Sequence, residues 1–140
     1  RPATLVKRDP SAPLNDGERV ISERTSAMVR DVLDYVVKEG TGGNADAEGY
    51  RVGGKTGTAD KPSRGAYNED ARIATFLGAF PIDDPKYVLL VMVDEPIPQE
   101  GTFGFATGGW VAAPAFKRIV ERTAPMLGLE KVVPAEGESD

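Results

Sequence analysis

Four successive residues combine a cation, two hydroxyl groups and a glycine: Lys55, Thr56, Gly57 and Thr58. If they form a β-strand, side chains alternate between its faces, so the two threonines share one face and Lys55 lies with Gly57 on the other. Gly57 has no side chain to obstruct a ligand. A strand at a sheet edge also offers unpaired backbone N–H and C=O groups. The segment therefore predicts a site for an anion such as a carboxylate, because strand twist can bring Lys55 and both hydroxyls to one edge.

The same segment also fits a phosphate-binding pattern. Residues 49–56 satisfy G-x-x-x-x-G-K-[ST]. That motif works only between a buried strand and the N-terminus of a helix. Here residues 40–48 are glycine-rich and polar, which favours a helix exit and loop, and residues 60–65 predict a turn or loop. Both flanks therefore disfavour a phosphate site.

Composition excludes several other kinds of chemistry. The 140 residues suffice for one domain, and the net charge of −5 with scattered Lys and Arg argues against nucleic acid as a partner. The chain has no cysteine and no histidine, which excludes thiol catalysis and a Ser-His-Asp triad within it. We therefore expect no metal ion and no cofactor. No apolar run approaches the roughly 20 residues of a membrane span.

Hydrophobic periodicity predicts two helices and three strands. Apolar residues recur at helical spacing in the first helix, Glu23–Lys38, and its charged residues are interpreted as a solvated face. A second helix is expected from about Pro114 to Thr123, before Pro125. The strands are expected at residues 50–59, 72–80 and 87–93, and the third is predicted to be buried on both faces because it is wholly apolar.

The connections favour an antiparallel meander. Residues 81–86 are a hairpin-length turn, and residues 60–70 are interpreted as a longer polar link. The strand with Lys55 would then lie at or near a sheet edge, where a peptide can add beside it. A long loop follows at residues 94–109, and its aromatic residues either line a groove or cover the sheet. Residues 1–21 are expected to form a lead-in segment with a short strand at residues 3–8, and residues 130–140 an acidic, frayed tail.

Two strings of the sequence resemble a known family. Residues 49–59, G-Y-R-V-G-G-K-T-G-T-A, resemble the K-T-G motif of class B penicillin-binding proteins, and residues 108–116, G-G-W-V-A-A-P-A-F, extend the likeness. It covers residues 22–129 and is greatest to the last part of the transpeptidase domain in septal, cell-division enzymes of Gram-negative type. The resemblance implies an α/β sandwich, of the α+β type shared with serine β-lactamases. This chain would supply about three antiparallel strands and two helices.

The resemblance implies an acyl transfer and assigns roles to the motif. In this family a serine attacks a D-alanyl-D-alanine stem peptide, and β-lactams trap that serine. Lys55 would support proton transfer, and the hydroxyls of Thr56 and Thr58 would bind the carboxylate of substrate or β-lactam. The backbone N–H of Thr58 would form half of the oxyanion hole, where each such donor contributes about a hundredfold in rate. Gly57 would leave clearance for the ligand.

The resemblance also implies partners and a location. Stem peptides, β-lactams and the upstream part of the same domain are expected partners, and divisome proteins are further ones. The parent protein would lie at the periplasmic face of the bacterial inner membrane, held by an N-terminal helix absent from this chain, which begins without Met and is interpreted as a fragment or processed piece. The incompletely covered sheet predicts association with the upstream part or with a second copy.

Two of the family's three motifs are missing. None of the five serines has a lysine three residues later, and none begins S-x-N. The nucleophile, its lysine and the other half of the oxyanion hole would therefore lie upstream, and we expect the isolated chain to be inactive. Two alternatives stay open: a non-catalytic peptide-binding module, and part of a serine β-lactamase or D,D-carboxypeptidase. The long motif string favours the transpeptidase.

Overall fold

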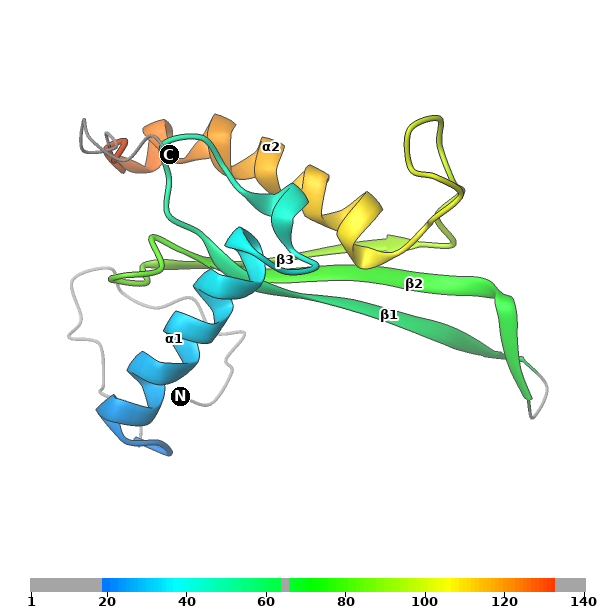
Figure 1. The fold of residues 1–140 in the computed structure, drawn as a ribbon, viewed down its shortest axis with the longest axis horizontal. Coiled ribbons are helices and arrows are strands. Elements are labelled where there is room, and N and C mark those ends of the chain that lie inside the picture. The colour runs from blue at the N-terminus through cyan, green and yellow to red at the C-terminus, as the bar shows by residue number, and fades with distance from the viewer. Residues whose placement is uncertain (1–18, 64–65, 133–140) are drawn as a thin grey trace, which may run out of the picture.

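The computed structural model describes residues 19–63 and 66–132 (Figure 1). The main elements follow one another as α1 (Glu23–Lys38), β1 (Gly53–Ser63), β2 (Ala66–Phe80), β3 (Tyr87–Asp94) and α2 (Ala113–Thr123). Three short helical turns join them: η1 (Gly43–Ala45), η2 (Gly108–Ala112) and η3 (Pro125–Leu127). The strand expected at residues 3–8, most of the lead-in and most of the acidic tail lie outside the described residues.

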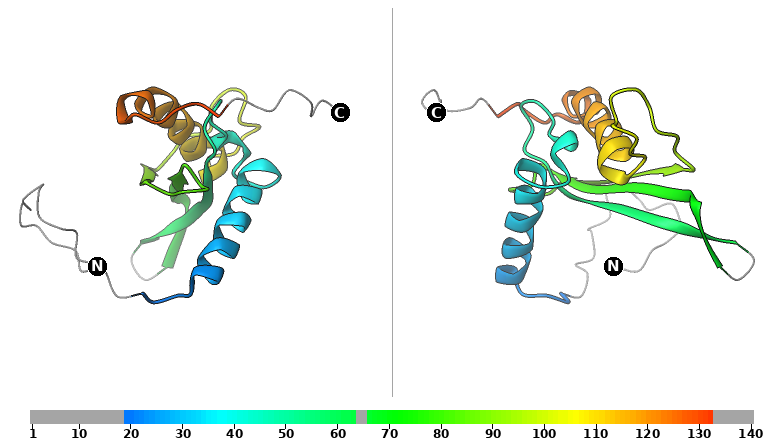
Figure 2. Two further views of the ribbon diagram at one scale, coloured as in Figure 1. Left: turned by 90° about the vertical axis from the view of Figure 1, so that its left-hand side faces the viewer. Right: turned by 45° about the vertical axis from the view of Figure 1, so that its right-hand side comes forward.

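The three strands form one antiparallel sheet in the order β1-β2-β3, which confirms the predicted meander. β1, which carries Lys55 to Thr58, is one edge of this sheet, as predicted. Figures 1 and 2 show α2 lying over one face of the sheet, whereas α1 runs past the sheet beside β1 and meets it only near the end of the helix. Residues paired across antiparallel strands point to the same face, so Thr56 shares the α2 face with its partner Phe76.

The prediction of a polar link at residues 60–70 was wrong. β1 continues to Ser63 and β2 begins at Ala66, so only residues 64–65 separate them. The pairing shifts register between Asp60 and Lys61 and then resumes, and Figure 1 shows the two-stranded ribbon extending past β3. Backbone pairing needs no apolar side chains, and a polar composition therefore does not exclude a strand.

The start of β1 was also misplaced. Residues 50–52 precede the strand, and the N–H of Tyr50 turns back to the carbonyl of Ala47 at 2.9 Å. The aromatic Tyr50 and the β-branched Val52 favour a strand locally. The turn at residues 47–50 instead uses the N–H of Tyr50, so strand pairing starts only at Gly53. Tyr50 and Val52 are instead buried in the core.

The core lies between the sheet and α2. Phe76 and Phe80 of β2 contact Phe116 of α2 edge to face, with ring centroids 4.8 and 6.1 Å apart. Gly78, between the two phenylalanines, lets the helix approach, because a Cβ there would lie 2.5 Å from the Phe116 ring. α2 ends at Thr123, before Pro125, as predicted.

The prediction that β3 is buried on both faces was wrong. Its side chains alternate, and Val88, Leu90 and Met92 are 71%, 54% and 59% exposed. Leu77 of β2 lies on the same face and is 49% exposed. We call these four residues the open face. An apolar run in sequence predicts a strand covered on both faces, but the described residues supply a covering layer on one face only.

α1 begins and ends where predicted. The Ser22 hydroxyl caps it by accepting from the N–H of Thr25 at 3.0 Å. The apolar stripe is buried only near its end, at Val37, and is largely exposed toward its start. The interpretation of its charges as a solvated face was wrong for Asp34.

Asp34 joins α1 to the segment before β1. Its carboxylate lies 2.8 Å from the ammonium of Lys38 and 3.0 Å from the guanidinium of Arg51, and its side chain is only 16% exposed. Burial alone would raise the pKa of Asp34, but the hydrogen bonds from the two cations outweigh burial and hold that pKa below its usual value.

Candidate functional site

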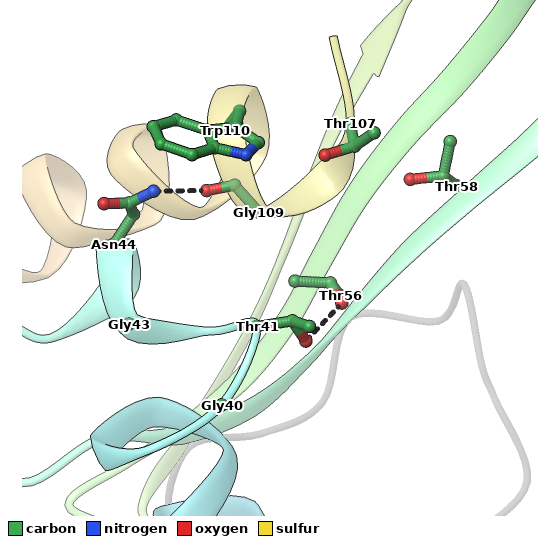
Figure 3. A pocket seen from close by; sticks show the side chains of 9 residues that line it. All are labelled: Gly40, Thr41, Gly43, Asn44, Thr56, Thr58, Thr107, Gly109 and Trp110. Carbon is green, nitrogen blue, oxygen red and sulfur yellow. Dashed lines mark hydrogen bonds between the residues drawn. The ribbon is translucent and has the colours of Figure 1, made fainter. Parts of the chain in front are cut away.

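A pocket of about 490 Å³ opens beside the edge strand (Figure 3). β1 contributes Thr56 and Thr58 to its wall, and the remaining lining comes from the loop after α1 and from the start of η2. These other lining residues are Gly40, Thr41, Gly43, Asn44, Thr107, Gly109 and Trp110. Four threonines and an asparagine amide with no lining carboxylate, among the residues that the structure describes, make this wall suited to an anion.

Lys55 and Thr56 are brought together at the pocket, although they leave opposite faces of β1. The Lys55 ammonium curves over the strand and donates to the carbonyl of Thr56 at 2.7 Å and to its hydroxyl at 3.4 Å. The Thr56 hydroxyl also lies 3.1 Å from the hydroxyl of Thr41, as Figure 3 shows. A cation therefore adjoins two hydroxyl groups at one rim of the pocket.

Thr58 is held by the segment that leads into α2. Its hydroxyl accepts a hydrogen bond from the backbone N–H of Gly108 at 3.1 Å. The next residue, Gly109, accepts from the side-chain amide of Asn44 at 2.9 Å (Figure 3). Segments far apart in sequence are thus joined around the pocket.

Gly57 has a neighbour on the face opposite the pocket. A Cβ at this position would lie 2.4 Å from the hydroxyl of Thr75, which donates to the Gly57 carbonyl at 3.3 Å. The absence of a side chain at Gly57 therefore gives the Thr75 hydroxyl room to reach β1, in addition to any clearance that it gives a ligand.

The aromatic residues of the long loop gather on Trp110. Phe103 contacts its ring edge to face at 5.5 Å, and Phe105 stacks on it at 6.3 Å. Trp110 lines the pocket, whereas Phe103 remains 81% exposed. Of the two alternatives for these aromatics, the structure therefore favours the wall of a groove over a cover for the sheet.

The carboxylates at the end of β3 are not part of the pocket. Asp94 and Glu95 lie 3.0 and 2.7 Å from the ammonium of Lys61, across the sheet. Hydrogen bonds from Lys61 to Glu95 and Asp94 raise the pKa of the lysine. This cluster is a surface ion-pair network at the base of the β1–β2 ribbon.

The sequence did not identify Thr41, Asn44 and Thr107 as pocket residues. Residues 40–44 were interpreted as a helix exit because of their glycines, and they do follow α1 directly. Thr41 and Asn44 nevertheless contact Thr56 and Gly109, which lie 15 and 65 residues further along the chain. Only the tertiary fold brings these residues together.

Neither a metal cluster nor a membrane-spanning helix occurs within residues 19–63 and 66–132. These residues bring together no group of three or more potential metal-ligating acidic side chains. The helices in the same part of the chain are too short or too polar to cross a bilayer.

Comparison with known proteins agrees on one family. The family described as "Penicillin binding protein transpeptidase domain" matches residues 4–121. The probable peptidoglycan D,D-transpeptidase FtsI of Caulobacter vibrioides is 43% identical over 94% of this chain. Stage V sporulation protein D of Bacillus subtilis is 48% identical over 91% of it. The chain spans only 24% and 18% of these two relatives.

Solved structures share the fold. The transpeptidase domain of Burkholderia pseudomallei penicillin-binding protein 3 superposes with a TM-score of 0.76 at 40% identity, covering 91% of this chain and 37% of that one. Penicillin-binding protein 3 of Mycobacterium tuberculosis, solved with ampicillin, gives a TM-score of 0.72 at 32% identity, covering 90% and 29%. With the antiparallel sheet, its edge K-T-G strand and the pocket beside it, these matches establish that the chain belongs to the penicillin-binding protein transpeptidase family.

Proposed function

We propose that this chain is the C-terminal part of a septal peptidoglycan D,D-transpeptidase and supplies one wall of its active site. The observation that carries the proposal is the placement of Lys55, Thr56 and Thr58 on an edge strand beside a pocket without lining carboxylates, among the described residues. The parent enzyme would cross-link stem peptides during septal wall synthesis, at the periplasmic face of the inner membrane and with divisome partners.

The motif residues have separate tasks in this proposal. The hydroxyls of Thr56 and Thr58 bind the terminal carboxylate of a D-alanyl-D-alanine stem, and a β-lactam carboxylate occupies the same place. The Lys55 ammonium, 3.4 Å from the Thr56 hydroxyl, adds positive charge and supports proton transfer. The backbone N–H of Thr58 stabilises the oxyanion that forms when the carbonyl is attacked. The serine that attacks it belongs to the upstream portion of the enzyme.

The open face is the natural contact for that upstream portion. Lys55 leaves β1 on the same face as its cross-strand partner Leu77. Leu77 is in turn paired with Leu90, and both are about half exposed. A layer of protein that covers these apolar side chains would gain about 25 cal/mol per Å² of apolar area removed from water. It would also bring its own residues to Lys55.

Labelling with a fluorescent penicillin tests the proposal. The chain is incubated with the reagent alone, and then after mixing with the separately expressed upstream portion of its transpeptidase domain. We expect no label on either piece alone, and label on the upstream piece once the two are combined. Lys55→Ala should abolish that label, whereas Lys86→Ala, at an exposed lysine in the β2–β3 turn, should not.

Three results would contradict the proposal. Covalent label on this chain alone would show that it carries its own nucleophile. A mixture that forms a stable complex by size-exclusion chromatography but takes no label would favour a non-catalytic peptide-binding module. Rapid hydrolysis of penicillin by the labelled complex would favour a β-lactamase.

A further inference from the structure

We infer that Asn44 is a positioning residue. By fixing the first turn of η2, it prepares the Thr58 hydroxyl to donate a hydrogen bond into the pocket. The inference rests on the proposed function, because it concerns how the K-T-G strand recognises a carboxylate. Asn44 does not belong to that strand and lies in η1. It acts on Thr58 only through the backbone of Gly108 and Gly109.

The hydrogen bonds in this relay have defined directions. The carbonyl of Gly109 can only accept, so the group that faces it at 2.9 Å is the amide nitrogen of Asn44. The backbone N–H of Gly108 can only donate, so the Thr58 hydroxyl accepts from it at 3.1 Å. Both contacts involve the same short stretch of η2, one residue apart.

The direction of the hydrogen bond from Thr58 to a ligand follows from the single proton of its hydroxyl group. One lone pair of its oxygen accepts the Gly108 N–H, so its proton points away from Gly108 and can donate to a ligand in the pocket. Thr56 differs, because its hydroxyl accepts from the Lys55 ammonium at 3.4 Å and also shares a hydrogen bond with the Thr41 hydroxyl, in which either oxygen can be the donor. A Thr58 hydroxyl prepared as a donor selects an ionised carboxylate over a neutral ester, because hydrogen bonds to a charged acceptor are about twice as strong.

The start of η2 is fixed by contacts on two sides, and Asn44 provides one of them. On one side, Gly108 is pressed against the sheet, where a Cβ would lie 2.3 Å from the Thr75 carbonyl oxygen. On the other side, the hydrogen bond from Asn44 fixes the Gly109 carbonyl. Loss of that bond frees the peptide group between Gly109 and Trp110, two peptide groups beyond the one that carries the Gly108 N–H. The start of η2 is then held less firmly, and the Gly108 N–H is aimed less well at Thr58.

The test compares an acid with its ester in the complete transpeptidase. Acylation rates are measured for benzylpenicillin and for its methyl ester, with wild type, Asn44→Ala and Asn44→Asp. We expect Asn44→Ala to lose about fivefold in rate with the acid, in line with one modest hydrogen bond, and less than about twofold with the ester. Asn44→Asp should lose more with the acid, because it also adds a carboxylate to the pocket wall. Gln99→Ala is the matched control, because it removes another amide-to-carbonyl bond, to Ile97, in the neighbouring loop. Its rates should equal those of wild type.

Each outcome has one meaning. An unchanged acid rate in Asn44→Ala, or equal losses for acid and ester, would overturn the inference. The ratio of acid rate to ester rate within one variant does not depend on the fraction of folded enzyme, so a loss of stability cannot imitate the expected result. If wild type itself reacts with neither compound, it is the proposed function that fails.

Discussion

Gly108 lies directly against the backbone of Gly57, although 50 residues separate them in sequence. A Cβ built on Gly108 would come within 2.6 Å of the Gly57 carbonyl oxygen and 3.1 Å of its nitrogen. No side chain fits in that space, so the start of η2 is seated on the K-T-G strand by backbone contact. The two strings of sequence that carry the family resemblance are therefore in physical contact at the pocket.

Gly108→Ala should displace η2 and disturb the pocket. A methyl group has no room there, and overpacking of this kind costs about 1–3 kcal/mol of folding free energy. Chemical denaturation of the chain measures the loss. Gly43→Ala is the control, because its Cβ would meet its nearest atom, the Val37 carbonyl oxygen, at an ordinary 3.7 Å. Equal stability of Gly108→Ala and wild type would show that η2 is not fixed on β1.

Thr58→Val should weaken the reaction with β-lactams in the complete enzyme. The substitution keeps the shape of the side chain and removes its hydroxyl, which we propose donates to the ligand carboxylate. A hydrogen bond to a charged group is worth about 1.5–3 kcal/mol, so we expect the acylation rate constant to fall about 10- to 100-fold. Thr123→Val removes a hydroxyl that only bonds to the Ile119 carbonyl in α2 and should leave that rate unchanged. Equal rates for Thr58→Val and wild type would remove Thr58 from the binding site.

Asp34→Asn should destabilise the chain in a pH-dependent manner. The pKa of Asp34 is lower in the folded state than its usual value of 3.8, because the bonds from Lys38 and Arg51 outweigh its burial. Its contribution to stability is therefore fully present above the unfolded pKa and is lost as the pH falls through the folded pKa. The variant should be about 1–2 kcal/mol less stable than wild type at neutral pH, and the difference should shrink below about pH 4.

Denaturant unfolding at several pH values measures that difference. Asp84→Asn is the control, because the side chain of Asp84 is 86% exposed and lies 4.0 Å from Lys86. This control should match wild type at each pH. If the difference in unfolding free energy between Asp34→Asn and wild type stayed constant down to acid pH, the charge of Asp34 would not stabilise the fold.

Local patterns predicted the parts of the fold that depend on nearby residues. The periodic apolar residues defined α1, and Pro125 defined the end of α2. The order of the sheet followed from short connections, which favour antiparallel neighbours. The β1–β2 ribbon was missed because strand pairing there depends on the partner backbone and not on apolar side chains.

The same distinction applies to the site, where residues contiguous in sequence were predicted and residues joined only by the tertiary fold were missed. Lys55 to Thr58 were found because their chemistry is contiguous in sequence. Asn44 was missed because its amide acts on a carbonyl 65 residues away, and nothing near Asn44 in sequence indicates that contact. The exposure of β3 was missed for a related reason, since its apolar sequence is suited to a covering layer that residues 19–63 and 66–132 do not supply on that face.

Leu90→Asn and Met92→Asn together should prevent this chain from combining with the upstream portion. Both side chains belong to the open face and are 54% and 59% exposed, so the change should cost the isolated chain little stability. It should abolish the penicillin label of the mixed portions and reduce any self-association seen by light scattering. Met126→Asn is the control, because Met126 is 84% exposed but lies in η3, away from the sheet. Undiminished label with the double variant would show that the upstream portion contacts another surface.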